Sequence, residues 1–399
     1  MSNVTLYPQP DGVPASTRYQ VHIDGQPSFV YMSTSPSEAE YTAGHVASWT
    51  SFDVAGACTV RIRRASGPIS TATVRPRSAG VRPSIEDGEV VLSLNHPCKL
   101  AVECDDDLTD ALFLFANAPE TDIPSRTAAD VVWFGPGVHE LGKFYELQAG
   151  TTYYLAPGAF LKGSLTGGGD GTRVIGRGVL SGADHRWPGH QMERSPERVD
   201  LVKLEGDGVQ LAGITLVDSP YYVVLAKGRD NRFDDLKVIA WYNNTDAISS
   251  GPGARIDDCF LRAADDIFKP FVDDTQIRRC VIWADKAAVF CLTWNARHDS
   301  GGSSVRDCDV IHHMPFCTAD TEWTGAVWRS WHGGHAHIHD LVFEDIRIEG
   351  RGPRLVDLFM QRNQWSPQAG EWGRFSRLQF RHITVDEPCR FPSRLRGHD

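Results

Sequence analysis

Leu211-Ala-Gly-Ile-Thr-Leu216 is the first of seven related phrases in this chain, each made of an apolar residue, a two-residue turn and an alternating strand. The others begin at Phe233, Ile256, Ile277, Val305, Phe343 and Phe380, so successive phrases start 22, 23, 21, 28, 38 and 37 residues apart. A short period of about 20 residues with one strand phrase per repeat is typical of a parallel β-helix or another solenoid. Leucine-rich repeats have a similar period, but their Leu-x-x-Leu-x-Leu pattern and asparagine ladder are missing. The phrases therefore predict a parallel β-helix.

Three aspartates lie at nearly the same distance before the phrase that follows them. Asp246 precedes Ile256 by 10 residues, and Asp265 and Asp266 precede Ile277 by 12 and 11 residues. Neighbouring coils of a β-helix lie about 4.8 Å apart, so we expect these carboxylates on one strip of the surface. Successive strand residues point to opposite faces, so Asp265 and Asp266 both face this strip only where the backbone turns or bulges.

The strip has the composition of a site that acts on sugars. Like charges close together raise one another's pKa, so one carboxyl stays protonated beside another that is ionised. Paired carboxyls of this kind carry out glycoside hydrolysis. The same phase holds Tyr221 and Tyr222 one coil earlier and Trp294 and Asn295 one coil later. We expect the aromatic rings to stack on sugar faces.

Several segments in sequence order resemble a known clan of enzymes. They are Ala156-Pro-Gly-Ala-Phe-Leu-Lys-Gly163, Ile175-Gly-Arg-Gly-Val-Leu-Ser-Gly182, Ser219-Pro-Tyr-Tyr222, Asn244-Thr-Asp246 and Asp265-Asp266. Together they are similar to the polygalacturonase and dextranase clan, glycoside hydrolase families 28 and 49, over roughly residues 120 to 385. The resemblance implies a right-handed parallel β-helix and hydrolysis with inversion at the anomeric carbon. By motif matching it makes Asp265 the general acid, with Asp246 and Asp266 holding and activating the water.

The departures from the clan's patterns favour one branch of it. Family 28 enzymes usually carry Gly-His-Gly and Arg-Ile-Lys segments after the paired aspartates, and neither occurs here. The spacing between Asp246 and Asp265, the presence of Lys269 after the pair and a β-rich N-terminal region are more similar to the dextranase and isopullulanase type. Ala247 stands where that pattern expects glycine. These features favour a neutral, glucan-type substrate over a pectic one.

The expected reaction is inverting hydrolysis, in which the acid and base carboxyls stand about 6.5 to 9.5 Å apart to admit a water molecule. Other classes of protein share the predicted fold. A polysaccharide lyase would release an unsaturated product that absorbs in the ultraviolet, and a fructan-cleaving transferase would give a cyclic or transferred product. A non-catalytic carbohydrate-binding solenoid has no use for three aspartates at one phase.

Further residues are candidates for contact with the substrate. Besides the four residues at the neighbouring phases, they are Trp241, Asn244, Lys269, His313, Trp331 and His332. His335, His337 and His339 alternate into a strand, unlike the helical His-Glu-x-x-His zinc motif. We therefore expect no metal site and no cofactor.

The chain has the length and composition of a two-domain globular protein. Its hydrophobic share is 41% and its charged share 23%, which are ordinary values for a soluble protein. Short alternating strands and turns such as Tyr19-Gln-Val-His-Ile-Asp-Gly25 and Cys58-Thr-Val-Arg-Ile-Arg-Arg64 predict a β-sandwich over residues 1–118. Pro119 and Pro124 mark the link to a β-helix over residues 119–399.

Charge and hydropathy exclude some partners. The formal net charge of -11 disfavours nucleic acid and anionic membrane surfaces. No stretch of 18 apolar residues predicts a membrane span. The start, Met1-Ser-Asn-Val-Thr-Leu-Tyr-Pro8, lacks the basic stretch and apolar core of a secretory signal. We expect a cytoplasmic protein, or a secreted one whose leader is not part of this sequence. Oligomeric state is not predicted.

The cysteines fit a packing role. Cys259, Cys280 and Cys308 occupy the same repeat position as Ile214 and Leu236. Free cysteine behaves as a small hydrophobe, and no Cys-x-x-Cys spacing indicates a metal or redox site. We therefore expect reduced cysteines in an inward-facing ladder.

Overall fold

The computed structural model describes residues 3–189, 195–316, 325–363, 366–367 and 369–398. Within these residues the regular secondary structure consists of β-strands, and one short 3-10 turn, η1 (Arg77–Ala79), is the sole helix. None of the described helical residues forms a segment that is long and apolar enough to cross a membrane. The chain divides into two compact units. The first comprises Met1–Glu140, Tyr153–Leu161 and Gly176–Val179, and the second comprises Leu141–Thr152, Lys162–Ile175 and Leu180–Asp399.

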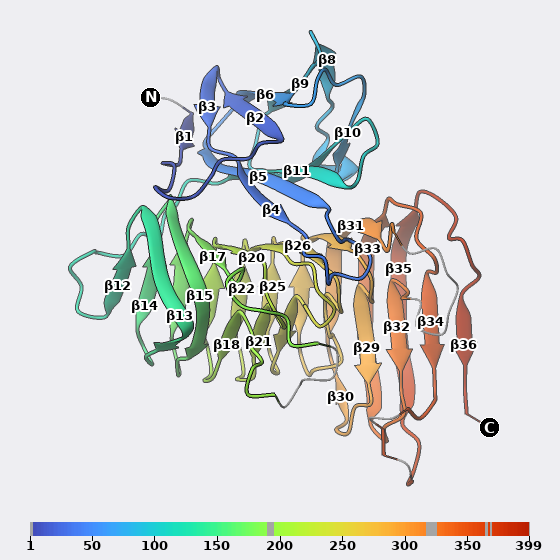
Figure 1. Ribbon diagram of the computed structural model, residues 1–399. Coiled ribbons are helices and arrows are strands. Elements are labelled where there is room, and N and C mark those ends of the chain that lie inside the picture. Colours follow the sequence, from blue (N-terminus) through green and yellow to red (C-terminus); the bar gives the residue numbers. More distant parts are fainter. Residues whose placement is uncertain (1–2, 190–194, 317–324, 364–365, 368, 399) are drawn as a thin grey trace. The chain divides into compact units, whose positions relative to one another are not determined.

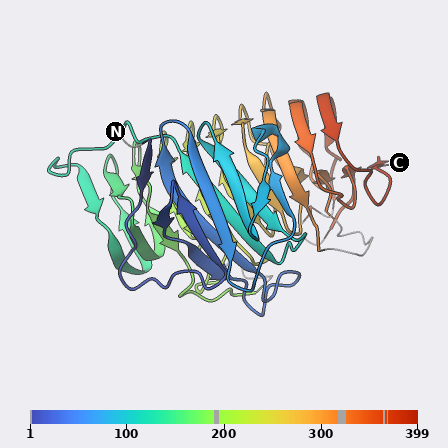
Figure 2. The same cartoon turned by 90° about the horizontal axis from the view of Figure 1, so that it is seen from above.

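The N-terminal strands form two sheets (Figure 2, blue to cyan). One contains β1 (Val4–Leu6), β4 (Tyr31–Thr34), β5 (Val46–Val54), β7 (Ala72–Arg75), β10 (Cys98–Cys104) and β11 (Asp110–Asn117). The other contains β2 (Tyr19–Ile23), β3 (Gln26–Ser28), β6 (Cys58–Arg64), β8 (Ser84–Glu86) and β9 (Glu89–Leu94). Their neighbouring strands run antiparallel except for the parallel pair β5 and β11.

The two sheets share one hydrophobic core. In β6 the residues Cys58, Val60 and Ile62 are buried, and the residues between them are exposed, as expected for a half-buried strand. These side chains belong to the same apolar cluster as Leu112 and Leu114 of β11 in the other sheet. Two sheets packed over a common core constitute a β-sandwich.

The remaining strands wind into a long parallel sheet with a smaller one beside it (Figure 1). The first of these are β12 (Val131–Phe134), β13 (Gly137–Leu147), β14 (Thr152–Leu155), β15 (Ala159–Gly167), β16 (Arg173–Gly176), β17 (Val179–Ser181), β18 (Val202–Leu204), β19 (Gln210–Ala212), β20 (Thr215–Val217), β21 (Val224–Ala226), β22 (Arg232–Asp234), β23 (Lys237–Ile239) and β24 (Ile248–Ser250). They are followed by β25 (Arg255–Asp257), β26 (Phe260–Ala263), β27 (Gln276–Arg278), β28 (Val281–Ala284), β29 (Phe290–Trp294), β30 (Ser300–Gly301), β31 (Ser304–His313), β32 (Trp328–Trp331), β33 (His337–Ile348), β34 (Val356–Phe359), β35 (Arg374–Val385) and β36 (Arg394–Arg396).

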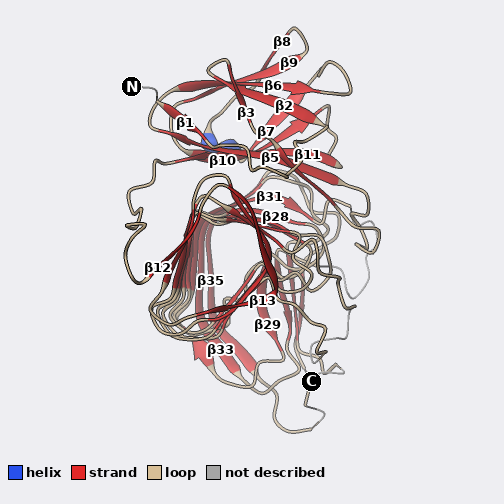
Figure 3. Cartoon of the chain, turned by 60° about the vertical axis from the view of Figure 1, so that its left-hand side comes forward, coloured by secondary structure: helices blue, strands red, loops and turns tan. Residues whose placement is uncertain are grey.

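Three parallel ladders run along this part of the chain. The first joins β15, β18, β21 and β24, and single bridges at Phe268 continue it to β29, β32, β34 and β36. The second joins β19, β22, β25 and β27, and the third joins β20, β23, β26 and β28; both then merge into the long strands β31, β33 and β35. Each coil thus supplies one strand to each of three faces around a central core (Figure 3). This is a parallel β-helix.

The repeated phrase forms the corner between the second and third ladders. Its first residue is the central residue of a strand, as Phe233 is in β22 and Ile256 is in β25, and these residues stack on one another. Its third residue is left-handed, with φ of 55° at Asp235 and 52° at Asp258. Asp and Gly tolerate this conformation better than most residues, so the phrase encodes a tight corner.

The cysteine ladder follows from the register. Cys259, Cys280 and Cys308 precede paired strand residues on successive coils, and all three are fully buried. The eight cysteines that the structure describes are free thiols. The predicted packing role is confirmed. The predicted fold class, an N-terminal β-sandwich followed by a parallel β-helix, is confirmed as well, and the predicted division at residue 118 stays a prediction.

Candidate active site

The first ladder places Asp246 and Asp266 side by side on adjacent coils. The residue after Asp246 donates its backbone N–H to the carbonyl oxygen of Asp266 over 3.1 Å. The same pattern links Asp200 to Tyr222 over 2.9 Å and Tyr222 to Asp246 over 3.0 Å. One register position therefore holds Asp200, Tyr222, Asp246 and Asp266 in succession, and the matching phase that the sequence predicts for the aspartates is confirmed.

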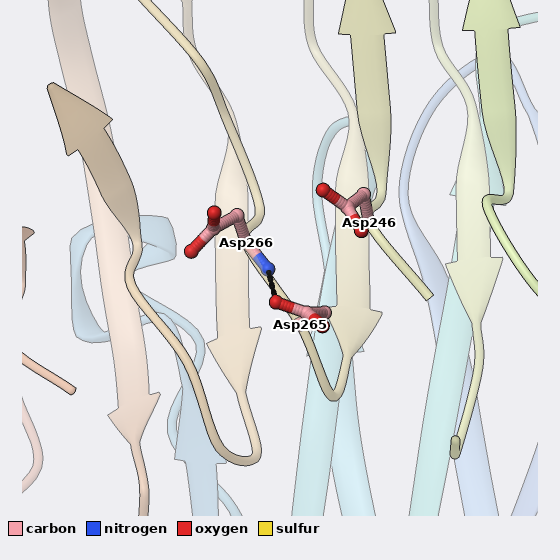
Figure 4. A group of neighbouring side chains, drawn as sticks. All are labelled: Asp246, Asp265 and Asp266. Atoms are coloured by element: carbon pink, nitrogen blue, oxygen red, sulfur yellow. Dashed lines mark hydrogen bonds between the residues drawn. The ribbon is translucent and has the colours of Figure 1, made fainter. Parts of the chain in front are cut away.

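Asp265 joins the other two aspartates because the backbone bends where β26 ends. The chain bends at Ala264 and Asp265, as the alternation of strand side chains required. The carboxylate of Asp265 accepts the backbone N–H of Asp266 over 2.9 Å and that of Asn244 over 2.7 Å. Asn244 itself has φ of 70°, so its left-handed turn directs this N–H toward the aspartate. Figure 4 shows the carboxyl group of Asp266 directed away from Asp246 and Asp265, toward the following coil, where its Oδ1 accepts the backbone N–H of Ala288 over 3.3 Å.

The three carboxyl groups lie close together. One oxygen from each of Asp246, Asp265 and Asp266 lies within 4.8 Å of the others. This limit applies to the nearest oxygens, whereas the expected distance of about 6.5 to 9.5 Å is a separation between acid and base carboxyl groups, which stays a prediction. The centre of a triangle with sides of 4.8 Å lies about 2.8 Å from each corner, which is a hydrogen-bond distance. A water molecule at that point would be within hydrogen-bond reach of one oxygen of each carboxyl.

Burial and mutual repulsion shift the protonation of this cluster. Asp246 is 4% exposed, and burial raises its pKa to about 8 against the opposing charge of Lys269. The pKa of Asp266 is raised too, mainly by burial and then by the charge of Asp265. Coupled carboxyls titrate as a unit, so the retained proton belongs to the cluster.

Lys269 neutralises part of this charge. Its ammonium group pairs with the carboxylate of Asp246 and lies 3.4 Å from the hydroxyl oxygen of Tyr222. Burial opposes the charge of Lys269, but the neighbouring carboxylates outweigh burial and raise its pKa well above the ordinary value. The lysine is therefore a fixed cation of the site.

Arg329 is a second cation, and the sequence analysis missed it. It lies on β32 at the register position of Cys291, and its charge lowers the pKa of Asp266. Its side chain is buried, with the guanidinium carbon 5.5 Å from the centre of the Trp294 ring. Its Nε and Nη2 have no hydrogen-bond partner among the described residues. Counting residues along the first ladder, in which Arg329 pairs with Cys291, would have found this arginine; counting back from the start of each phrase did not.

Two cations facing three carboxyls leave one excess negative charge when all are ionised. In a buried place this excess is costly, and retaining one proton removes it. Three clustered carboxylate oxygens are donors of the kind that a divalent cation takes, although such an ion needs about six or more ligands. Lys269 and Arg329 compete with such an ion, so the arrangement is better suited to a protonated acid and a bound water.

The aromatic residues at the neighbouring phases are less open than expected. Tyr221 is fully buried, so the prediction that its ring faces a sugar is wrong. Tyr222 is half-buried, and its ring centre lies 4.7 Å from both the Lys269 ammonium and the Arg198 guanidinium. Trp294 is half-buried and stands edge to face with Trp331, with ring centres 5.3 Å apart.

Five other predicted contact residues are buried. Trp241 is 1% exposed and lies against the Arg262 guanidinium, so it packs in the core. Asn295 uses its amide to bind other loops, and its oxygen accepts the N–H of Gly333 over 3.1 Å. The others are His313, Trp331 and His332. Their predicted contact with substrate stays a prediction. Asn244 and Lys269 remain at the carboxylate cluster.

Comparison with known proteins agrees with this fold. No protein-family model matches the chain. Isopullulanase from Aspergillus niger is 26% identical over 381 residues, a match that covers 77% of this chain and 67% of that protein. Dextranase from Arthrobacter globiformis is 26% identical over 263 residues, covering 57% of this chain but only 41% of the dextranase. A probable exopolygalacturonase B from Aspergillus terreus is 24% identical and covers 47% of each chain.

A solved structure has the same fold. Dex49A from Penicillium minioluteum superposes with a TM-score of 0.76 at 19% sequence identity, covering 97% of this chain and 91% of that one. Fold and carboxylate cluster define a parallel β-helix protein of the glycosidase type. Within that class the chain is similar to dextranase and isopullulanase, and it is related to the polygalacturonases of family 28. The resemblance drawn from the sequence is confirmed.

Proposed function

We propose that this protein is an inverting glycoside hydrolase that cleaves a neutral glucan-type poly- or oligosaccharide. The observation that carries the proposal is the cluster of Asp246, Asp265 and Asp266, in which one oxygen of each carboxyl lies within 4.8 Å of the others. A water that donates one hydrogen to Asp246 and the other to Asp266 has both of its O–H groups satisfied. Such a water is a positioned nucleophile with its base beside it.

The proposed roles follow the motif match. Asp265 protonates the leaving oxygen, while Asp246 and Asp266 orient and deprotonate the water on the opposite side of the sugar. The raised pKa of Asp246 and Asp266 means that the cluster arrives with a proton, which a bound water can pass between neighbouring carboxyls. Lys269 holds Asp246 in place through its ion pair.

A neutral substrate is favoured by the charges of the site. Lys269 pairs with Asp246, and the charge of Arg329 acts on Asp266, so the site has no cation in excess to hold an acidic sugar. The curated relatives carry the names isopullulanase and dextranase, which point to pullulan and dextran as first substrates to test. The test is reducing-sugar release from dextran, pullulan, pectin, fructan and their oligosaccharides. Release from pectin alone would overturn the neutral-substrate proposal, and no release from any would overturn hydrolysis.

The stereochemical outcome needs its own test. The nearest carboxyl oxygens lie within 4.8 Å of one another. The alternative is retention, in which one carboxylate is the nucleophile and the two carboxyl groups stand about 5 to 5.5 Å apart. Proton NMR of the first-formed sugar during hydrolysis distinguishes the two. We expect the anomer opposite to that of the substrate linkage, and the same anomer would replace the water mechanism with a covalent intermediate on one of the aspartates.

A further inference from the structure

A hollow lies on the coils that precede the carboxylate cluster. Its volume is about 520 Å³, and its walls include Phe144, Arg198, Asp200, Lys203 and Lys227. All of these residues belong to the second compact unit, which also contains the carboxylate cluster. The hollow and the carboxylate cluster therefore lie in the same compact unit.

The backbone register connects this hollow to the cluster. Asp200, in its wall, occupies the same register position as Asp246, with Tyr222 on the coil between them. Two coil steps correspond to about 10 Å along the axis. A second row runs parallel to the first, in which Lys203 pairs with Leu225 and Leu225 pairs with Ser249. An extended ligand that lies along the axis at the cluster thus reaches the hollow.

The walls of the hollow suit a polyhydroxylated, uncharged ligand. Arg198 donates to the carboxylate of Asp200 over 2.9 Å, so these two charges compensate each other. The remaining charges are of both signs, since Lys203 and Lys227 share the walls with Glu146. Sugar hydroxyls both donate and accept hydrogen bonds, so a wall of mixed donors and acceptors matches them better than it matches an anion.

The hollow also offers an apolar surface. Phe144 on β13 is 51% exposed, a high fraction for a phenylalanine. An exposed ring beside hydrogen-bonding groups is the combination that stacks on a sugar face while polar neighbours hold the hydroxyls. Arg198 joins the hollow to the cluster physically, since its guanidinium lies 4.7 Å from the ring centre of Tyr222.

We propose that this hollow is a remote subsite for the same neutral glucan chain, in which Phe144 stacks on a sugar unit while Lys203 and Asp200 bind its hydroxyls. The inference rests on the proposed function and deepens it. A chain held both in the hollow and at the cluster is bound over several units, so long chains are preferred to short ones.

The test measures binding of glucan chains of two lengths. Phe144→Ala and Lys203→Ala are each combined with Asp265→Asn and titrated by calorimetry with long and short fractions of dextran and of pullulan oligosaccharides. The usual energies of one aromatic contact, for Phe144, and of one hydrogen bond, for Lys203, predict that each change lowers affinity for the long fraction about threefold to tenfold more than for the short one. Leu395→Ala and Arg255→Ala are matched controls, since Leu395 is 76% exposed, Arg255 is exposed on β25, and neither lines the hollow.

The outcomes separate this inference from the proposed function. A loss of affinity that is larger for the long chains supports the subsite. It does so even when the protein with Asp265 intact cleaves none of the glucans, a result that would disprove hydrolysis alone. Equal losses on both fractions, or no loss on the long one, overturn the subsite while hydrolysis stands. Failure of every glucan fraction to bind overturns both. Circular dichroism and the melting temperature of each variant show whether it is folded.

Discussion

At the scale of single residues, the site is defined by carboxyl groups that burial and proximity keep from ionising together. Asp246 and Asp266 differ by one coil step, and a backbone bend adds Asp265. Charges this close in a buried place interact far more strongly than in water. The ion pair of Asp246 with Lys269, the second cation Arg329 and a retained proton compensate this negative charge.

Asp265→Asn tests the role of the proposed acid. We expect turnover to fall by about two to four orders of magnitude, the usual contribution of a general acid, with the melting temperature nearly unchanged. A substrate whose leaving group needs no protonation should restore much of this loss in Asp265→Asn and little of it in Asp246→Asn. An active Asp265→Asn variant on the natural linkage would remove Asp265 from the mechanism.

The pH dependence of activity follows from the raised pKa of Asp246. This carboxyl loses its proton near pH 8 in the folded protein, and the cluster then carries its full negative charge. Activity should therefore be highest on the acidic side and fall as pH rises through about 8. A rate profile measured from pH 4 to 10 checks this expectation, which a flat alkaline limb would contradict.

The same shifts make stability depend on pH, and Asp266→Asn tests the sign. Because the folded pKa of Asp266 lies above the unfolded value of 3.8, the folded state binds the proton more tightly, and stability is lost as pH rises through the folded pKa. Asparagine does not ionise, so the variant avoids this loss. We expect it to match wild type near pH 3 and to be more stable at pH 9 by roughly 1 kcal/mol or more in free energy of unfolding. Denaturant titrations at both pH values measure the difference.

Residue roles were only partly predictable from sequence. The carboxyls of Asp246, Asp265 and Asp266 were found because a charged triplet at one phase has few structural explanations. Tyr221 and Trp241 are more deeply buried than expected, since phase gives an angle around the axis and not the depth of a side chain. Arg329 was missed because its coil follows insertions that disturb the count.

At the scale of elements, the corners of the coils are as constrained as the strands. A Cβ at Gly228 would lie 1.7 Å from the carbonyl oxygen of Gly206, and one at Gly251 would lie 2.2 Å from that of Gly228. Glycines at the turns after β18, β21 and β24 therefore allow successive coils to approach closely. The coil spacing at the active site depends on this packing.

Gly228→Ala tests the close approach. The added methyl group meets backbone rather than a movable side chain, so we expect the free energy of unfolding to fall by about 1 to 3 kcal/mol. Gly135→Ala is the control, because a Cβ there meets nothing within 4 Å and the residue is not left-handed. Equal melting temperatures for the two variants would contradict the argument.

Sequence predicted these elements well where the period was short. The phrases starting at Phe233, Ile256 and Ile277 match strands β22, β25 and β27. On these coils the strands of the second and third ladders, and the corner between them, recur at a nearly constant spacing in the sequence. The long continuous strands β31, β33 and β35 were not foreseen. In them the corner residue stays within the strand, and only neighbouring coils reveal that the ladder continues.

At the scale of the whole molecule, the net charge of -11 bears on substrate choice. A negative protein slows the approach of polyanions at low salt, whereas a neutral glucan feels no such field. We expect KM for the preferred glucan to vary less than about twofold between low and high salt. A steep fall in KM with added salt would instead indicate an anionic substrate.

The sequence by itself determined the fold class, the cysteine ladder and the identity of the carboxylate triplet. Each depends on a repeating pattern, and a solenoid brings residues of equal phase together whatever its finer details. Only the tertiary structure decided the separation of the carboxyls, the bend that turns Asp265 inward, the pairing of Lys269 with Asp246 and the depth of each aromatic ring. These depend on how neighbouring coils pack against one another, and the spacing of residues along one chain does not contain that information.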